Sequence, residues 1–325
     1  MARTFITGVS GQDGSYLADR LVAQGIDVHA LVRSREDPDA IAAAKRHPTV
    51  TFHEGDLGDE ARIRILLDDV DPDEVYNLAG ISSVAQSWSE PVLTGRITGL
   101  AVTTLLDGLW SLQESTGRER KLLQASSAEI FGTPDVSPQD EFTPIRPTSP
   151  YGAAKAYAHQ MVGLYRSRGL FAATCILYNH ESPRRPERFV TRKITATVAR
   201  IAQGNQDRLV LGDLDVRRDW GWAPDYVDAM MRTIAAPEPS DFVIATGESH
   251  SVREFVDAAF AAAGIDDWHD RVESDPALLR VGDAAELRGD ASRAREVLGW
   301  APTRGFRDVV AAMVDADLRG SESDG

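Results

Sequence analysis

Three glycines near the start of the chain constrain its fold more than any other feature. Gly8, Gly11 and Gly14 follow the short apolar segment 4–7 and lead into a helical pattern. In such a strand–turn–helix unit the first two glycines permit a tight turn against a pyrophosphate, and the third lets the helix pack on the strand. The phosphate charge then lies at the helix N-terminus. The turn therefore predicts a dinucleotide cofactor bound by Gly8, Gly11, Gln12, Asp13 and Gly14.

Strand-like and helical segments alternate through the first half of the chain. The expected strands are 4–7, 27–33, 50–54, 74–78, 121–126 and 172–178, with helices such as 60–67 and 97–113 between them. This alternation is typical of a parallel sheet covered on both faces. After Tyr178 a polar segment with two prolines leads into irregularly mixed short elements. We predict an α/β fold of the Rossmann type. Its doubly wound parallel sheet would occupy residues 1–178, with later segments returning to it, and a smaller, mixed substrate-binding region would occupy 179–325.

Charge and cysteine content limit the partners and the compartment. The 325 residues carry a formal net charge of −15, which should repel nucleic acid and anionic membranes. No uninterrupted apolar stretch approaches about 18 residues, so we expect no membrane span. The single cysteine, Cys175, excludes an internal disulfide and favours a reducing, cytoplasmic location. The seven histidines show no metal-ligand spacing, and we expect no metal.

The end of the second predicted strand distinguishes two forms of the cofactor. An acidic residue there would bond the ribose 2′-hydroxyl of NAD, whereas an arginine can accommodate the 2′-phosphate of NADP. Arg33 and Arg35 occupy this place, so NADP is expected, while the acidic residues 36–37 keep NAD open. After the third strand comes Asp56, followed by Leu57. Asp56 could accept a hydrogen bond from the adenine amino group or, nearly as well, cap the next helix.

Four further residues form a candidate catalytic group. Tyr151 and Lys155 are four apart and would share one helix face, where the lysine would lower the pKa of the phenol. The tyrosinate could then take a hydroxyl proton while hydride leaves for a nicotinamide. Ser127 could bond the reacting oxygen. Glu129 could remove an acidic proton beside a ketone and protonate a leaving hydroxyl, although on spacing alone a surface glutamate is an equally good interpretation.

At these motifs the chain resembles the GDP-mannose 4,6-dehydratases of the extended short-chain dehydrogenase/reductase family. The matching stretches are 7–17, 124–129, 149–155, 179–193, 218–226 and 245–255, and the resemblance runs from residue 4 to about 302. It implies catalytic roles for Ser127 (usually threonine in the family), Glu129, Tyr151 and Lys155. It implies nucleotide-sugar binding by Asn179, Lys193, Arg218 and Arg280.

The resemblance implies a specific reaction. An NADP-dependent hydro-lyase would convert GDP-D-mannose to GDP-4-keto-6-deoxy-D-mannose by internal hydride transfer and elimination of water. A sugar-nucleotide 4-reductase or epimerase on the same fold is the alternative, and a non-catalytic NADP-binding protein is a more distant one. A homo-oligomer is expected. Because segment 33–38 departs from the family loop that reaches a neighbouring subunit, a dimer is as plausible as the family's tetramer. Segment 81–84 also departs from the family pattern, in a loop expected near the cofactor.

Overall fold

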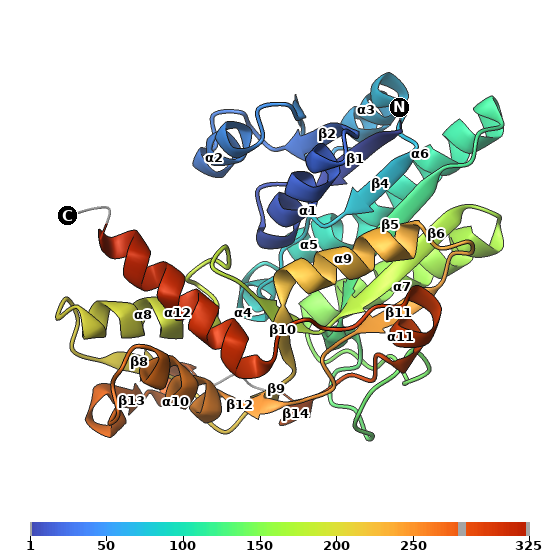
Figure 1. Ribbon diagram of the computed structural model, residues 1–325. Helices are drawn as coiled ribbons and strands as arrows, with labels where there is room; N and C mark the ends of the chain where they lie inside the picture. Colours follow the sequence, from blue (N-terminus) through green and yellow to red (C-terminus); the bar gives the residue numbers. More distant parts are fainter. Residues whose placement is uncertain (1, 279–283, 323–325) are drawn as a thin grey trace.

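A parallel sheet of seven strands forms the centre of the computed structural model, which describes residues 2–278 and 284–322. The strand order is β11-β6-β5-β4-β1-β2-β3, and all six neighbouring pairs are parallel. The strands are β1 (Arg3–Thr7), β2 (Asp27–Val32), β3 (Thr51–Glu54), β4 (Glu74–Asn77), β5 (Lys121–Ser127), β6 (Phe171–Leu177) and β11 (Asp241–Ile244). Figure 1 shows them as one twisted layer between helices. The predicted doubly wound α/β fold is confirmed.

Helices cover both faces of this sheet, each through its own apolar core. One core joins the sheet to α1 (Gln12–Ala23), α9 (Ala223–Ile234) and α11 (Ser292–Leu298). The other joins it to α3 (Glu60–Val70), α6 (Ala101–Thr116) and α7 (Pro150–Ser167). Apolar side chains therefore dominate both faces of the sheet, as is typical of parallel sheets.

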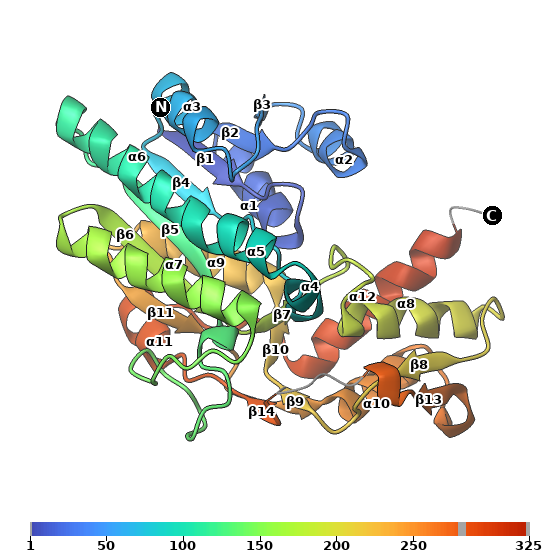
Figure 2. The same cartoon turned by 180° about the vertical axis from the view of Figure 1, so that it is seen from behind.

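One long helical run crosses the second face. The elements α5 (Pro91–Thr94), the π-helical η1 (Gly95–Leu100) and α6 follow one another without a break from Pro91 to Thr116. By length and composition alone this run could cross a membrane, and half of its apolar window is buried inside the protein. It packs against α3 and α7 (Figure 2). The short helices α2 (Pro38–Arg46) and α4 (Val84–Ser89) complete this half.

The later part of the chain builds a second layered region beside the sheet. Its core lies between α8 (Val190–Ala202), α10 (Val252–Ala262) and α12 (Phe306–Glu322). Its short strands are β7 (Asn179–Glu181), β8 (Leu209–Leu211), β9 (Arg217–Arg218), β10 (Trp220–Trp222), β12 (His250–Ser251), β13 (Val272–Ser274) and β14 (Glu286–Leu287). Short 3₁₀ turns are η2 (Ala128–Ile130), η3 (His269–Arg271) and η4 (Pro276–Leu278). Figure 1 shows this region below and to the left of the sheet.

The chain returns to the large sheet after building part of the second region. Helix α9 covers its face and β11 adds the seventh strand beside β6. The sequence predicts six strands, and the additional strand is the four-residue segment Asp241–Ile244. The division into 1–178 and 179–325 stays a prediction.

The strand order locates the place where a ligand can bind. The order reverses at β1, because β2 and β3 extend to one side of β1 and β4, β5, β6 and β11 extend to the other. In open α/β sheets, ligands occupy the crevice beyond the carboxyl ends of the strands at such a reversal. The glycine turn leaves β1 at this edge.

Candidate active site

The glycine turn has the geometry of a phosphate-binding loop. Gly8 has φ +78°, and a Cβ there would lie 2.8 Å from the Ala79 nitrogen. A Cβ on Gly14 would lie 2.2 Å from the Gly8 carbonyl oxygen, so only glycine lets α1 start this close to β1. Helix α1 has no side-chain hydrogen bond at its N-cap, Gly11, within the described residues. Its first N–H groups can therefore bind an anion.

The side chains of Gln12 and Asp13 connect this turn to β7. Gln12 Nε2 donates to the His180 carbonyl at 3.0 Å, and Gln12 Oε1 accepts from Ser182 Oγ at 2.8 Å. Asp13 Oδ2 lies 2.9 Å from His180 Nε2. Both side chains thus hold the turn against the segment 180–182, and their direct contact with a cofactor stays a prediction.

The arginines after β2, which are predicted to bind the 2′-phosphate of the cofactor, are exposed. Arg33 pairs with Asp37 at 3.3 Å, and 81% of its side chain is exposed. Arg35 Nη2 donates to the Phe52 carbonyl at 2.5 Å. Asp37 is already occupied, because its Oδ1 accepts the Asp39 N–H and so caps α2.

Asp56 and Leu57 form the turn between β3 and α3. Asp56 Oδ1 accepts the Gly58 N–H at 2.7 Å. The N-cap of α3 is Asp59, which accepts the Arg62 N–H, so the alternative interpretation of Asp56 as the helix cap is wrong. Asp56 itself is exposed, whereas Leu57 is buried in the core below α3.

The structure brings Ser127, Glu129, Tyr151 and Lys155 together where β5 ends and α7 begins. Ser127 Oγ accepts the Glu129 N–H and is hydrogen-bonded to Tyr151. A Cβ on Gly152 would lie 2.5 Å from the Glu129 carbonyl oxygen, so this glycine lets α7 approach the turn after β5.

Burial dominates the ionisation of the tyrosine and the lysine. Burial raises the pKa of Tyr151 to about 12; the hydrogen bond with Ser127 opposes this rise, and the charge of Glu129 adds to it. Burial lowers the pKa of Lys155 to about 8, against the charge of Asp13. Burial therefore outweighs every influence that lowers the pKa of Tyr151 here, and a lowering by Lys155 stays a prediction. Lys155 Nζ donates to the Ala125 carbonyl at 2.6 Å and lies 5.9 Å from the centre of the phenol ring.

Three of the four residues predicted to bind a nucleotide sugar are placed by the structure, and they lie in the second region. Asn179 begins β7 and is half-buried. Lys193, in α8, donates to the Val210 carbonyl at 2.6 Å. Arg218, in β9, is mostly buried, and its Nη1 donates to the carbonyl of Ala284 at 2.8 Å. Arg280 lies outside the described residues.

Comparison with known proteins decides the family. The family model described as GDP-mannose 4,6 dehydratase matches residues 5–313. The chain belongs to the GDP-mannose 4,6-dehydratase family. It is 44% identical to GDP-mannose 4,6 dehydratase 1 of Arabidopsis thaliana, over 96% of this chain and 89% of that protein. It is 39% identical to GDP-mannose 4,6-dehydratase of Vibrio cholerae, over 98% and 94%. The resemblance found in the sequence is thereby confirmed.

The fold of this dehydratase-family chain recurs in a related class of enzymes. A solved structure of UDP-glucose 4-epimerase from Thermus thermophilus, in complex with NAD, has a TM-score of 0.84. It is 27% identical and covers 98% of this chain and 99% of its own. The dehydratase family therefore shares its architecture with epimerases, and the fold does not separate the two reactions.

Sequence analysis missed Arg185, which lies among the predicted site residues. Its Nε lies 3.3 Å from Glu181 Oε2, and its guanidinium covers the Phe189 ring at 3.8 Å. Its positive charge lowers the pKa of both Asp13 and Tyr151. The family motif 179–185 contains this arginine, but the resemblance implied a binding role only for Asn179.

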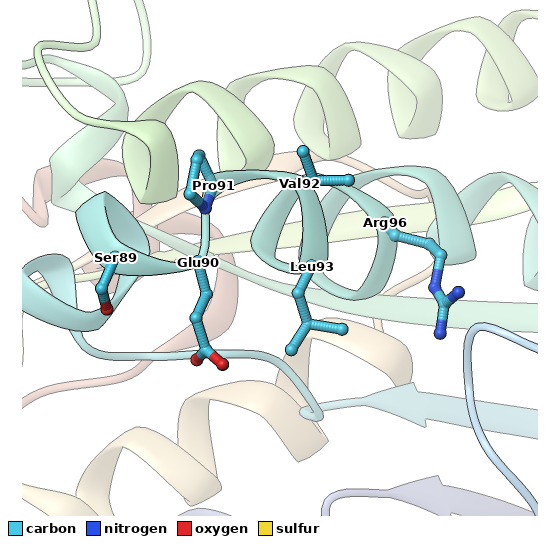
Figure 3. Close-up of a pocket in the computed structure, with 6 residues that line it drawn as sticks. All are labelled: Ser89, Glu90, Pro91, Val92, Leu93 and Arg96. Carbon is cyan, nitrogen blue, oxygen red and sulfur yellow. The ribbon is translucent and has the colours of Figure 1, made fainter.

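A surface hollow of about 440 Å³ lies where α4 ends and the helical run from Pro91 begins. Its lining residues are Ser89, Glu90, Pro91, Val92, Leu93 and Arg96. In Figure 3, Glu90, Leu93 and Arg96 point to one side of the helix, as their spacing of three requires. None of these residues belongs to the predicted site. Among the described residues no cluster of histidine, cysteine or carboxylate side chains could hold a metal ion.

Proposed function

We propose that this chain removes water from GDP-D-mannose and forms GDP-4-keto-6-deoxy-D-mannose, with NADP as its cofactor. Glu129 carries the proposal. It is half-buried beside the Ser127–Tyr151 pair, where its charge acts on the phenol. A reductase or epimerase needs the serine, tyrosine and lysine but no carboxylate at this position. Membership of the dehydratase family supports the same interpretation.

The residues of the glycine turn fit a bound dinucleotide. The positions of Gly8 and Gly14 exclude any side chain, and the N–H groups of α1 can face a pyrophosphate. Arg33 and Arg35 favour NADP, because Asp37, the carboxylate that could instead bond a ribose hydroxyl, already caps α2 and pairs with Arg33. When bound, the oxidised nicotinamide would supply a positive charge, an acceptor for the C4 hydride and the source of the hydride for C6.

Tyr151 performs the first proton transfer. The positive charge of a bound oxidised nicotinamide would favour the phenolate of Tyr151 over the neutral phenol. Tyr151 Oη then takes the proton of the sugar 4-hydroxyl. Ser127, already hydrogen-bonded to the phenol, stabilises the oxygen at C4 as it becomes a ketone. Lys155 holds the phenolate and the ribose of the cofactor in place.

Glu129 performs the elimination. The 4-ketone makes the C5 proton acidic, and the Glu129 carboxylate removes it. The same carboxyl group then donates this proton to the C6 hydroxyl, which leaves as water. Because the hydride returns to C6, the cofactor ends in its starting oxidation state. Asn179, Lys193, Arg218 and Arg280 would hold the nucleotide sugar, whose diphosphate carries negative charge that Lys193 and the two arginines can bind.

One incubation tests this function. Pure protein, NADP and GDP-mannose are combined, and the product is measured by mass spectrometry together with the absorbance of the nicotinamide. We expect loss of one water with no net change in absorbance. A product of unchanged mass would indicate an epimerase, and steady consumption of NADPH in a parallel incubation with NADPH in place of NADP would indicate a reductase; either result contradicts the proposal.

A further inference from the structure

A row of polar side chains crosses the centre of the large sheet. Thr7 of β1 is the register partner of Asn77 in β4, and Asn77 is the partner of Gln124 in β5. All three side chains are fully buried. Polar groups in such a place are costly unless each finds a hydrogen bond. The row therefore has to be bonded from one strand to the next.

The hydrogen bonds of this row run in one direction along the sheet. Thr7 Oγ1 donates to Asn77 Oδ1 at 2.6 Å, and Asn77 Nδ2 donates to Gln124 Oε1 at 2.7 Å. Gln124 Nε2 then donates to the carbonyl oxygen of Ala125 at 2.8 Å. The amide of Gln124 is thus fixed at its oxygen by Asn77, and only its nitrogen remains to orient the Ala125 carbonyl.

The same Ala125 oxygen accepts Lys155 Nζ at 2.6 Å. Ala125 lies one residue beyond Gln124, which forms the last register pair of β4 and β5. The Ala125 carbonyl, which accepts a hydrogen bond from the Lys155 ammonium, therefore lies just beyond the last residue pair between β4 and β5. Gln124 supplies a second donor to this carbonyl, close to the lysine.

We propose that Gln124 is a positioning residue for Lys155, acting through the Ala125 carbonyl oxygen that both side chains share. Asn77 and Thr7 hold the Gln124 amide in the orientation that this requires. The importance of Lys155 for turnover rests on the function proposed above, but the placement of its ammonium group does not.

The row also reaches the cofactor turn. Thr7 Oγ1 accepts the Ala79 N–H at 3.1 Å. The same Ala79 nitrogen is the atom that a Cβ on Gly8 would meet first. One continuous set of hydrogen bonds therefore fixes the wall of the glycine turn at one end and the lysine of the catalytic group at the other.

The decisive variant is Gln124→Met, which keeps the length of the side chain and removes both ends of the amide. The Ala125 oxygen then accepts from Lys155 without competition, which favours the charged amine. We expect the pH midpoint for reductive methylation of Lys155, followed by peptide mass spectrometry, to move upward. The charge of Asp13, the group that acts on Lys155, is unchanged in this variant.

We expect kcat for the dehydration by Gln124→Met to fall about 10-fold or more and KM to change less than about 2-fold, as for a misplaced catalytic group.

Two further variants complete the test. Thr174→Val is the matched control, because Thr174 is the fully buried register partner of Gln124 on β6 and has no bond to Ala125. Its Lys155 midpoint and kcat should equal those of the wild type. Gln124→Glu keeps the acceptor for Asn77 and loses the donor to Ala125. Because its negative charge raises the midpoint by itself, only kcat is compared for this variant, and we expect the same fall of about 10-fold or more. It serves if the methionine variant does not fold.

The labelling result separates the two proposals. If the wild-type protein has no dehydratase activity, the proposed function is wrong. The pH midpoints of Lys155 labelling would still test whether Gln124 positions this lysine. A folded Gln124→Met variant whose midpoint stays at the wild-type value, or falls, would overturn the positioning role, as would a wild-type kcat in Gln124→Glu. An equal shift in Thr174→Val would do the same, because it would show a general effect of changing a buried polar residue in the sheet.

Discussion

The Asp13 carboxylate lies 2.9 Å from Nε2 of His180, although 167 residues separate the two in the chain. Burial alone would raise the pKa of Asp13 and lower that of His180, but their mutual attraction outweighs it. The net effect is a lowered pKa for Asp13 and a raised pKa for His180. The imidazole also stacks on the Tyr226 ring at 4.4 Å. A buried ion pair thus joins the glycine turn to the second region.

This pair predicts a pH-dependent contribution to stability. Because the folded pKa of His180 is raised above 6.5, its contribution is full below pH 6.5 and is lost as pH rises through the folded value. The contribution of Asp13 is full above pH 3.8 and is lost as pH falls through its lower folded value. His180→Gln should therefore reduce the free energy of unfolding most between pH 3.8 and 6.5.

The size of this loss should be about 3 kcal/mol in denaturant titrations, since removal of one partner leaves a buried charge unpaired. His269→Gln is the control, because His269 pairs with Asp267 at an exposed site and should have no such effect. A loss for His180→Gln that is the same at pH 5 and pH 9 would contradict the ion pair.

The close approach of α1 to β1 predicts that Gly14 tolerates no side chain. In Gly14→Ala the new Cβ would meet the Gly8 oxygen at 2.2 Å, so the helix must shift. We expect a loss of about 1–3 kcal/mol in unfolding free energy and weaker NADP binding in calorimetry. Gly163→Ala in α7 meets nothing within 4 Å and should be neutral or slightly stabilising. Equal stability of the two variants would refute the packing argument.

Glu129→Gln separates cofactor binding from elimination. The amide cannot remove the C5 proton, so dehydration should fall by about 10²- to 10⁴-fold, while NADP binding remains. The reaction is followed in deuterium oxide, where the wild type should place deuterium at C5 of the product. Glu141→Gln is a comparable change at another half-buried glutamate and should retain turnover. Full turnover by Glu129→Gln would remove Glu129 from the mechanism.

Arg33→Ala tests the choice of cofactor. Loss of a charge-assisted contact to the 2′-phosphate should raise the dissociation constant for NADP about 10-fold or more and leave that for NAD unchanged. Arg46→Ala, also exposed and at the end of α2, should change neither constant. Binding of NADP and NAD that weakens equally in Arg33→Ala would speak against a phosphate contact.

Local patterns were sufficient to predict six of the seven strands of the sheet and the candidate catalytic group. The glycine spacing and the alternation of strands predicted β1 to β6 to within one residue of their bounds, because each strand is a short apolar run bounded by polar residues. Ser127, Glu129, Tyr151 and Lys155 were predicted together from two motifs, and the start of α7 beside the end of β5 explains why they meet.

Contacts between distant segments could not be predicted in this way. Strand β11 is four residues long and finds its partner β6 only in the folded chain. The bonds of Gln12 and Asp13 to the segment 180–182, and the raised pKa of Tyr151, depend on burial and on neighbours far away in the sequence. No spacing rule contains that information.

Strand β11 has a consequence for how the molecule unfolds. It is an outer strand of the large sheet, but it is reached only after the chain has built β7, α8 and β8 to β10 in the second region. Cutting the chain after residue 178 would expose the edge of β6 and uncover the face that α9 and α11 protect. Neither half is then a complete folding unit, so the two regions should lose their structure in one cooperative transition.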